Sequence, residues 1–195
     1  MPALIHLPRR RSFAGAAMIV LTAGAVAFAP AAAHAATRKA PATCANADLT
    51  PATASVGKLR AAVLCLQNVD RVKHGLAPLK ESAKLRKAAL AHSTDMVRRS
   101  YFAHTSRGGS TFVTRIVKAG YVRRAGAWTL GENLAWGTGE LGTARAVQKA
   151  WMRSRGHRAN ILKPGYREIG IGIRLGVPSN SGVGATFTTD FGRKS

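Results

Sequence analysis

Apolar residues recur at helical spacing in four stretches of the chain. The pattern predicts helices over about 55–75, 81–100, 111–120 and 143–154. Ser or Thr at a helix start can cap the first turn, and glycine can end a helix in the left-handed conformation. The residues predicted to face inward are Val56, Leu59, Val63 and Leu66 in the first helix, Leu85, Ala89, His92 and Met96 in the second, Phe112, Ile116 and Val117 in the third, and Val147, Ala150 and Trp151 in the fourth.

The strand pattern is concentrated late in the chain. Ile169, Ile171 and Ile173 alternate with Gly170 and Gly172, which is the period of two expected for a strand. Residues 185–191 form a second predicted strand after a turn rich in Gly, Pro and Ser. Because the helices come first, the strands come late and no βαβ alternation is present, the sequence predicts an α+β fold with helices packed on an antiparallel sheet.

The first 35 residues have the organisation of a secretory signal peptide. A positive patch at Arg9, Arg10 and Arg11 precedes an uncharged apolar run over residues 13–29, and a small-x-small cleavage pattern ends at Ala35. We therefore predict a signal peptide over residues 1–35 and a secreted, extracellular protein; an uncleaved membrane anchor is the alternative. Consecutive arginines suit both the Sec route and the twin-arginine route, and the pattern does not separate the two.

Two cysteines follow the predicted cleavage site. Outside the cytosol an isolated pair usually forms a disulfide, so we predict a Cys44–Cys65 bond; a catalytic thiol is the alternative. The bond would tie residues 36–54, an Ala-, Thr- and Pro-rich leader without periodicity, to the first helix. The predicted organisation is therefore a signal peptide, this leader and one domain over residues 55–195.

The chain is strongly basic. Its 195 residues include 30 Lys and Arg against 8 Asp and Glu, a net charge of +22, and the hydrophobic fraction of 46% is too high for a disordered polycation. Arg145, Lys149 and Arg153 form a basic stripe facing solvent on the fourth predicted helix. For an exported protein this charge favours anionic cell-envelope polymers or lipid headgroups as partners, and a solvated surface shaped by composition is the alternative. Nucleic acid is not favoured, because no recognition motif is present, and the sequence carries no signal of the oligomeric state.

The chain has no local motif of a common catalytic site: HExxH, GxSxG, Walker and dinucleotide-binding patterns are all absent from the sequence. Its few carboxylates and imidazoles are instead placed beside glycines and helix ends. Glu132 and Glu168 lie in glycine-containing segments, while His104 and His157 follow the second and fourth predicted helices. Glycines that allow close backbone approach and histidines at helix ends are typical of a concave polar site.

Four segments together resemble the successive motifs of the CAP superfamily, which includes cysteine-rich secretory proteins, antigen 5 and plant pathogenesis-related class 1 proteins. They are YFAHT at 101–105, GENLA at 131–135, WMRSRGHRANIL at 151–162 and YREIGIG at 166–172. The resemblance covers about residues 58–193, in the order of the family. It implies a CAP-type α-β-α sandwich with a central cleft, and it implies that a His-Glu-His-Glu tetrad meets there, formed by His104, Glu132, His157 and Glu168.

The tetrad has the chemistry of a weak divalent-metal site. Two imidazoles, His104 and His157, can ligate a cation such as Zn²⁺, while Glu132 and Glu168 can orient an imidazole or accept a proton from bound water. We predict a divalent cation, preferably zinc, as the cofactor, and no organic cofactor. A polar network that braces the cleft loops without a metal is the alternative.

Three functions from different classes fit these features. The first, which we favour, is a secreted binding module whose cleft or basic surface holds lipid or an anionic cell-envelope component. The second is a metal-dependent hydrolase with Glu132 and Glu168 as catalytic candidates, and the third is a structural or interaction protein with an inert cleft. Four nearby residues are interpreted as structural: His92 in the core, Asn160 in satisfying loop backbone groups, and Trp128 and Trp136 in packing beneath the cleft.

Overall fold

The computed structural model describes residues 43–122, 126–179 and 182–195. The chain divides into two units, Met1–Ala36 and Thr37–Ser195, and all described residues belong to the second. The predicted signal peptide over residues 1–35 and the first part of the predicted leader lie outside the described residues. Within the described part of the chain, no helix has both the length and the apolar character needed to span a membrane.

Helices and a four-stranded sheet make up the described domain. In chain order the elements are α1 (Val56–Lys73), β1 (Lys80–Glu81), α2 (Ala83–Arg98), α3 (Phe112–Lys118), β2 (Trp128–Thr138), the short 3-10 helix η1 (Gly139–Gly142), α4 (Ala144–Arg153), α5 (Arg155–Ile161), β3 (Glu168–Leu175) and β4 (Gly184–Lys194). The strand order in the sheet is β1-β3-β4-β2. β2 and β3 are antiparallel to β4, and the two-residue β1 is parallel to β3.

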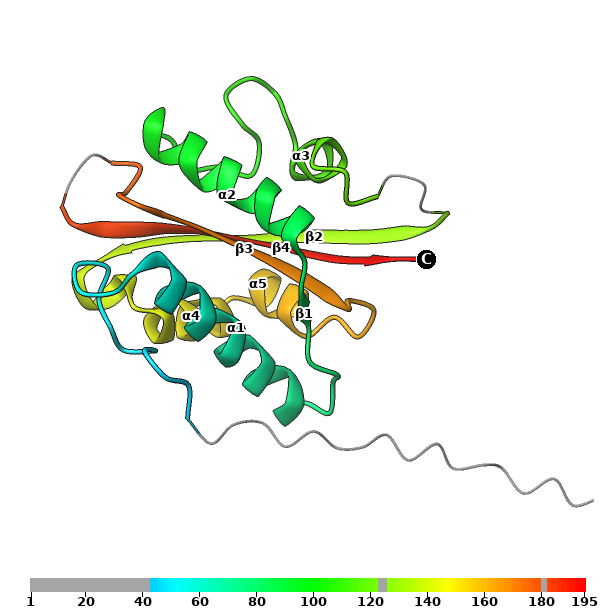
Figure 1. Cartoon of the computed structure of the whole chain (residues 1–195), viewed down its shortest axis with the longest axis horizontal. Coiled ribbons are helices and arrows are strands. Elements are labelled where there is room, and N and C mark those ends of the chain that lie inside the picture. The colour runs from blue at the N-terminus through cyan, green and yellow to red at the C-terminus, as the bar shows by residue number, and fades with distance from the viewer. Residues whose placement is uncertain (1–42, 123–125, 180–181) are drawn as a thin grey trace, which may run out of the picture. The chain divides into compact units, whose positions relative to one another are not determined.

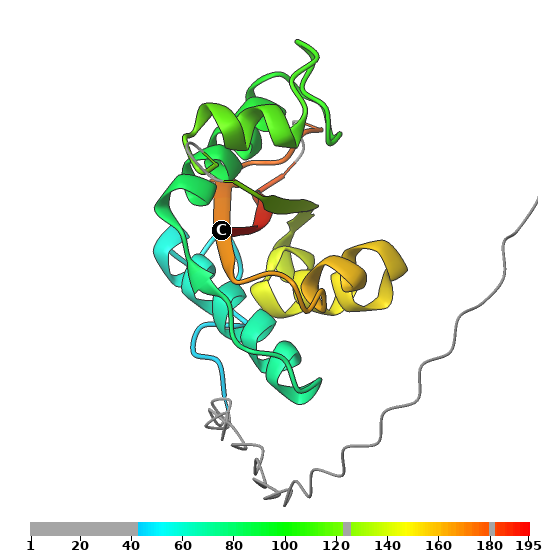
Figure 2. The same ribbon diagram turned by 90° about the vertical axis from the view of Figure 1, so that its right-hand side faces the viewer.

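The helices cover both faces of the sheet (Figures 1 and 2). α2 and α3 lie on one face, and α1, α4 and α5 lie on the other. The predicted α+β class and the three-layer α-β-α sandwich are therefore confirmed. The sheet differs from the prediction at one edge, where the chain between α1 and α2 adds the short parallel strand β1.

Capping residues explain where the predicted helices begin and end. The hydroxyl oxygens of Ser55, Thr111 and Thr143 accept hydrogen bonds from backbone N–H groups in the first turns of α1, α3 and α4. Gly75 and Gly120, with φ angles of 71° and 81°, follow the ends of α1 and α3. The helix boundaries thus come from local interactions that are visible in the sequence.

Two predicted core positions are wrong. Val117 in α3 and Ala150 in α4 are exposed, because each of these short helices buries a narrower stripe than the periodicity suggests. The sequence pattern also does not separate α5 from α4. Ser154 has an extended backbone, with ψ of 123°, so it breaks the helix and a new one begins at the next residue. His157 consequently lies within a helix of its own.

Isoleucines and glycines alternate along β3. The isoleucines face the main core, and the glycines face α2. The three isoleucines are at most 2% exposed and belong to the main core cluster. On the opposite face, a Cβ atom added to Gly170 would lie 2.1 Å from the backbone nitrogen of Arg86 in α2, and Gly172 meets the α2 backbone at the same distance. The glycines therefore let α2 lie directly on the sheet.

β2 is a long strand that the sequence pattern does not predict. Its sequence, WTLGENLAWGT, includes Gly, Glu and Asn residues, which are depleted in strands. Pairing with β4 along the whole strand, from Trp128 opposite Lys194 to Thr138 opposite Gly184, holds it in the sheet. The tertiary partner thus overrides the local preference of the sequence.

A buried arginine fixes the segment that leads into β3. Arg71 of α1 is fully buried, and burial lowers the pKa of its guanidinium to about 10. Its side chain donates hydrogen bonds to four backbone carbonyls, those of Ala77, Ile161, Lys163 and Tyr166. Through these bonds α1 holds both the end of α5 and the approach to β3, whose first residue is Glu168.

The predicted disulfide is present. Cys44 and Cys65 are bonded, with 5.7 Å between their Cα atoms. Residues 43–54 form turns and bends, and Ala47 and Ala54 pack in the same core as α1. The bond therefore fastens this stretch of chain to the middle of α1.

The disulfide has a measurable consequence. Because the chain contains only two cysteines, the folded protein is expected to show no reactive thiol when it is denatured without reductant. Replacing both cysteines by alanine is expected to lower the free energy of unfolding by about 3 kcal/mol, since the unfolded chain gains freedom. Thiol titration and urea unfolding measure the two effects. Two equivalents of thiol in the unreduced protein would contradict this prediction.

Candidate functional site

Two members of the predicted tetrad, His104 and Glu132, are hydrogen-bonded to each other. His104 follows α2 and Glu132 lies in β2, and the Nδ1–H of His104 donates a hydrogen bond of 2.8 Å to Glu132 Oε1. The Glu132 side chain is 1% exposed, whereas that of His104 is 55% exposed. The buried carboxylate thus orients an accessible imidazole and leaves Nε2 as the ring nitrogen that can bind a cation or a proton.

Arg115 of α3 supplies the positive charge beside Glu132. Its Nη2 donates to Glu132 Oε2 over 2.6 Å, and the two side chains are 9% and 1% exposed. The same guanidinium donates to the carbonyl oxygen of Ser110, so it also fixes the loop before α3. Sequence reasoning missed Arg115, because one basic residue among 30 has no local pattern that distinguishes it.

α5 brings His157 to the same region. Asn133 of β2 donates a hydrogen bond of 2.9 Å to the backbone carbonyl of His157, and Asn160 donates to the backbone carbonyl of Glu132 over 3.1 Å. The predicted role of Asn160 in satisfying backbone groups is confirmed. Partial burial, and then the charge of His104, lower the pKa of His157. His157 is therefore a neutral imidazole at pH 7, near enough to His104 to be affected by its charge.

Glu168 is bonded by a tyrosine, whereas Glu132 is bonded by His104. The hydroxyl of Tyr121 donates a hydrogen bond of 2.6 Å to Glu168 Oε2, and burial together with this contact raises the pKa of Tyr121. In the sheet register Glu168 lies opposite Gly192, and Glu132 lies opposite Asp190, two residues away along β4. Both glutamates therefore occupy the face that α2 and α3 cover, but Glu168 bonds the chain between α3 and β2 rather than an imidazole.

His92 is buried as predicted, whereas Trp128 and Trp136 are exposed. His92 is a fully buried core histidine as predicted: burial lowers the pKa of its imidazole, and its Nε2–H donates to the carbonyl of Ala103. The packing predicted for Trp128 and Trp136 is wrong, since they are 45% and 44% exposed. They lie at the two ends of the 11-residue edge strand β2, which the 7-residue α3 is too short to cover.

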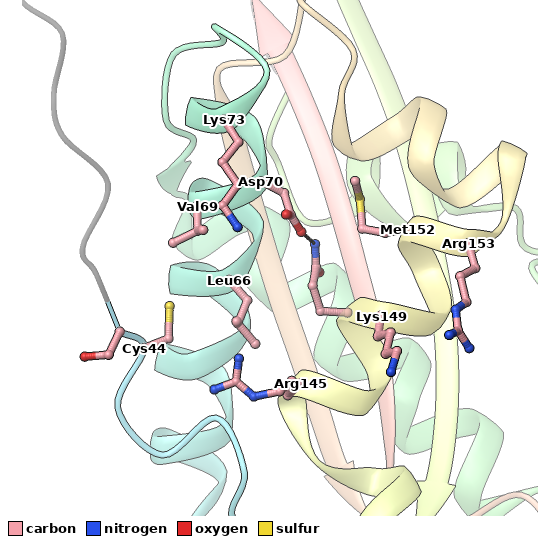
Figure 3. Close-up of a pocket in the computed structure, with 11 residues that line it drawn as sticks. Cys44, Leu66, Val69, Asp70, Lys73, Arg145, Lys149, Met152 and Arg153 are labelled. Atoms are coloured by element: carbon pink, nitrogen blue, oxygen red, sulfur yellow. Dashed lines mark hydrogen bonds between the residues drawn. The ribbon is translucent and has the colours of Figure 1, made fainter.

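A groove lies between α1 and α4, away from the tetrad (Figure 3). This α1–α4 groove has a volume of about 600 Å³. Leu66, Val69 and Met152 contribute apolar surface to it. Four cations line it as well, with Lys73 on the α1 side and Arg145, Lys149 and Arg153 on the α4 side. The basic stripe predicted on the fourth helix is therefore one wall of a groove.

The acids near the α1–α4 groove already have partners. Asp70 accepts a hydrogen bond of 2.7 Å from Gln148, and the exposed Asp48 pairs with Arg145 over 2.6 Å. In the described ranges of the chain, the other three groove cations have no ion-pair partner; they are Lys73, Lys149 and Arg153. The groove thus combines apolar surface with three cations that form no ion pair among the described residues.

The sequence profile of the Cysteine-rich secretory protein family, known as CAP, matches residues 64–189. This match covers more than half of the chain and includes all four tetrad positions. The chain belongs to the CAP family. The family assignment agrees with the order of the four sequence motifs and with the three-layer fold.

Two curated relatives of this CAP protein come from Bacillus subtilis (strain 168). "Uncharacterized protein YkwD" is 39% identical over 135 residues, which are 69% of this chain and 50% of that protein. "Uncharacterized membrane protein YlbC" is 35% identical over 111 residues, which are 57% of this chain and 30% of that protein. The chain thus spans half or less of the length of these curated relatives.

Two solved structures share the fold of this CAP domain. An extracellular protein containing a SCP domain from Bacillus anthracis str. Ames has a TM-score of 0.58 and 24% identity, with 72% of this chain and 44% of that chain covered. An outer surface protein from Borrelia burgdorferi has a TM-score of 0.60 and 20% identity, with 73% of this chain and 97% of that chain covered. At these identities the likeness concerns the fold alone.

The CAP tetrad offers two nitrogen ligands rather than a complete metal-binding set. Among residues 43–122, 126–179 and 182–195, no group of three or more His, Cys, Asp and Glu side chains is arranged to hold a metal ion. His104 and His157 are nitrogen donors of the kind that zinc prefers, and a structural zinc site needs four ligands. With these two nitrogen donors alone, a zinc ion would need water to complete its coordination.

Proposed function

We propose that this CAP protein is an exported binding module that holds a phosphate-bearing, anionic component of the cell envelope in the α1–α4 groove. Lipid headgroups and envelope polymers share this chemistry. Export is supported by the predicted signal peptide over residues 1–35 and by the Cys44–Cys65 bond, which suits an oxidising compartment. It is further supported by similarity to a protein described as extracellular and to an outer surface protein.

The observation that carries the proposal is the pairing of unpartnered cations with apolar surface in one groove. Lysine and arginine bind phosphate through charge-assisted hydrogen bonds, which are stronger than neutral ones. Three such side chains in the groove form no ion pair with any described residue, so an incoming anion need not displace an existing ion pair. Burial of an acyl chain or polymer backbone on Leu66, Val69 and Met152 adds a hydrophobic contribution.

Charge reversal in the α1–α4 groove tests this proposal. Replacing Lys149 and Arg153 together by Glu is expected to weaken binding to vesicles that contain an anionic phospholipid by about tenfold or more, since each basic residue near such a surface contributes about 1 kcal/mol. The matched control replaces Lys84 and Lys87, two exposed lysines of α2, by Glu and makes the same change in net charge. Binding of the wild-type protein is expected to weaken as salt rises.

Competition then separates the two sources of phosphate. Displacement from the vesicles by soluble polyphosphate indicates a polymer ligand, whereas retention in its presence indicates recognition of the lipid. Equal weakening by both double variants would show that overall charge, and not the α1–α4 groove, is responsible. Binding that is independent of salt would count against an anionic ligand altogether.

We also propose that the His/Glu cleft takes up a divalent cation weakly, with His104 and His157 as its protein ligands. Glu132 and Glu168 act there through hydrogen bonds or water. A zinc ion, when bound, supplies Lewis acidity toward a water or a carbonyl group. The contribution of the chain is to orient His104 through Glu132 over 2.8 Å and to keep His157 neutral. Metal-dependent hydrolysis is the second candidate function, favoured by this oriented imidazole.

A further inference from the structure

Asp190 is a buried acid to which the functions above assign no role. It lies in β4 with none of its surface exposed, and neither of its carboxyl oxygens has a hydrogen-bond partner among the described residues. In the sheet register it lies between Glu132 of β2 and Gly170 of β3. Side chains directly opposite each other in a sheet point to the same face, so the carboxyl groups of Asp190 and Glu132 are neighbours.

Among residues 43–122, 126–179 and 182–195, one permanent positive charge is paired with these two acids. Arg115 from α3 is that charge, and it is bonded to Glu132. His104, from the loop after α2, also bonds Glu132, and the buried His92 of α2 is neutral at pH 7 because burial lowers its pKa. Adjacent buried carboxyl groups do not readily both ionise. Burial first, and then the charge of Glu132, raise the pKa of Asp190.

We propose that Asp190 keeps its proton at neutral pH and donates it in a hydrogen bond to Glu132, which makes Asp190 a positioning residue for the His104–Glu132 pair. Glu132 is then the single buried anion of this region and accepts hydrogen bonds from His104, Arg115 and Asp190. Three donors on one carboxylate fix its orientation, and with it the His104 tautomer that carries hydrogen on Nδ1.

The proton of Asp190 acts on His104 through the carboxylate of Glu132. In the tautomer whose Nδ1–H is held by Glu132, the imidazole presents the lone pair of Nε2. An ionised Asp190 could not donate to Glu132 and would place a second buried negative charge beside a carboxylate that is paired with Arg115. This role concerns the His104–Glu132 pair and is independent of what the α1–α4 groove binds.

NMR spectroscopy tests the proposal directly. In the wild-type protein at pH 7, the Asp190 Cγ resonance is expected at the position of a protonated acid, and the ring ¹⁵N shifts of His104 are expected to show the tautomer with hydrogen on Nδ1. Asp190→Asn is expected to retain that tautomer, because the amide can donate in place of the acid. Asp190→Ala has no donor and is expected to reduce the population of the tautomer.

Thr189→Val is the matched control for these variants. Thr189 is also fully buried, and its hydroxyl also lacks a hydrogen-bond partner among the described residues, but as the adjacent residue of the strand it faces the other side of the sheet. This substitution is expected to leave the His104 tautomer unchanged. A change equal to that of Asp190→Ala would show that the tautomer reports packing in β4 rather than the proton of Asp190.

The pH dependence of stability gives an independent measurement. Above the ordinary aspartate pKa of 3.8, the unfolded chain releases a proton that folded Asp190 keeps. Wild-type stability should therefore fall relative to Asp190→Asn as pH rises, with the folding equilibrium constant changing by up to tenfold per pH unit. An Asp190 Cγ resonance at the ionised position at pH 7 would overturn the proposal whether or not the variants fold. Equal tautomer populations in Asp190→Ala and Asp190→Asn would overturn the positioning role.

Discussion

Replacing Gly170 by alanine is expected to lower the free energy of unfolding by about 3 kcal/mol or more, the upper part of the range for overpacked cores. The new Cβ atom would lie 2.1 Å from the backbone nitrogen of Arg86 and equally close to the backbone carbonyl carbon of Leu85. Real Cβ contacts do not reach such distances, so α2 must move away from β3. That movement would also disturb the polar contacts between the same helix and β4, such as the 2.8 Å hydrogen bond between Ser93 and Thr188.

Two further variants show whether the backbone contact is the cause. Gly156→Ala is the matched control, because nothing lies within 4 Å of a Cβ atom at that position in α5, and it is expected to be neutral or to stabilise by up to about 1 kcal/mol. Trimming the neighbouring side chain with Leu85→Ala is expected not to rescue Gly170→Ala. Urea unfolding of each variant provides the measurement. A Gly170→Ala protein with wild-type stability would show that α2 does not lie directly on the sheet.

Replacing either His104 or His157 by alanine is expected to abolish zinc uptake while the domain stays folded. The two imidazoles are the proposed nitrogen ligands, and one remaining nitrogen cannot hold the ion at micromolar concentration. His104 is 55% exposed, so its removal takes little apolar surface from the core. Titration calorimetry measures zinc binding, and circular dichroism checks that the variants are folded.

Protons compete with zinc for the same nitrogen atoms, so uptake is expected to fall as the pH is lowered. Because the pKa of His157 lies below the ordinary histidine value of 6.5, this ligand is still neutral at pH 6.5. The loss of zinc that is caused by protonation of His157 therefore begins below pH 6.5. His74→Ala is the matched control, since His74 is an exposed imidazole at the end of α1, outside the tetrad. Equal zinc binding by wild type and all three variants would show that the tetrad is not the metal site.

The predicted helices and the late strand pair are present because their signals are local. Helix caps such as Ser55 and Thr143 act within one turn, and the isoleucines of β3 alternate within one strand. β2 has no such signal. Its glycines and polar residues argue against a strand, and only its pairing with β4, which follows about 50 residues later in the chain, makes it one.

Some residues of the candidate site are indicated by sequence motifs, and others are revealed only by the structure. The tetrad positions come from motifs that resemble those of the CAP family, and the structure links His104, Glu132 and His157 through hydrogen bonds and charge. The groups that control their chemistry carry no comparable motif. Arg115 is one basic residue among 30, and Asp190 stands in an ordinary strand sequence.

The sequence by itself determined where helices begin, which strand alternates, that the two cysteines can join, and that the chain is strongly basic. These properties depend on residue type and on neighbours within a few positions. Only the tertiary structure decided that the basic stripe of α4 faces Lys73 across a groove and that Asp190 lies beside Glu132. Charge balance and burial depend on which side chains the fold brings together, and residues as far apart as Arg115 and Asp190 share an environment only after the sheet has formed.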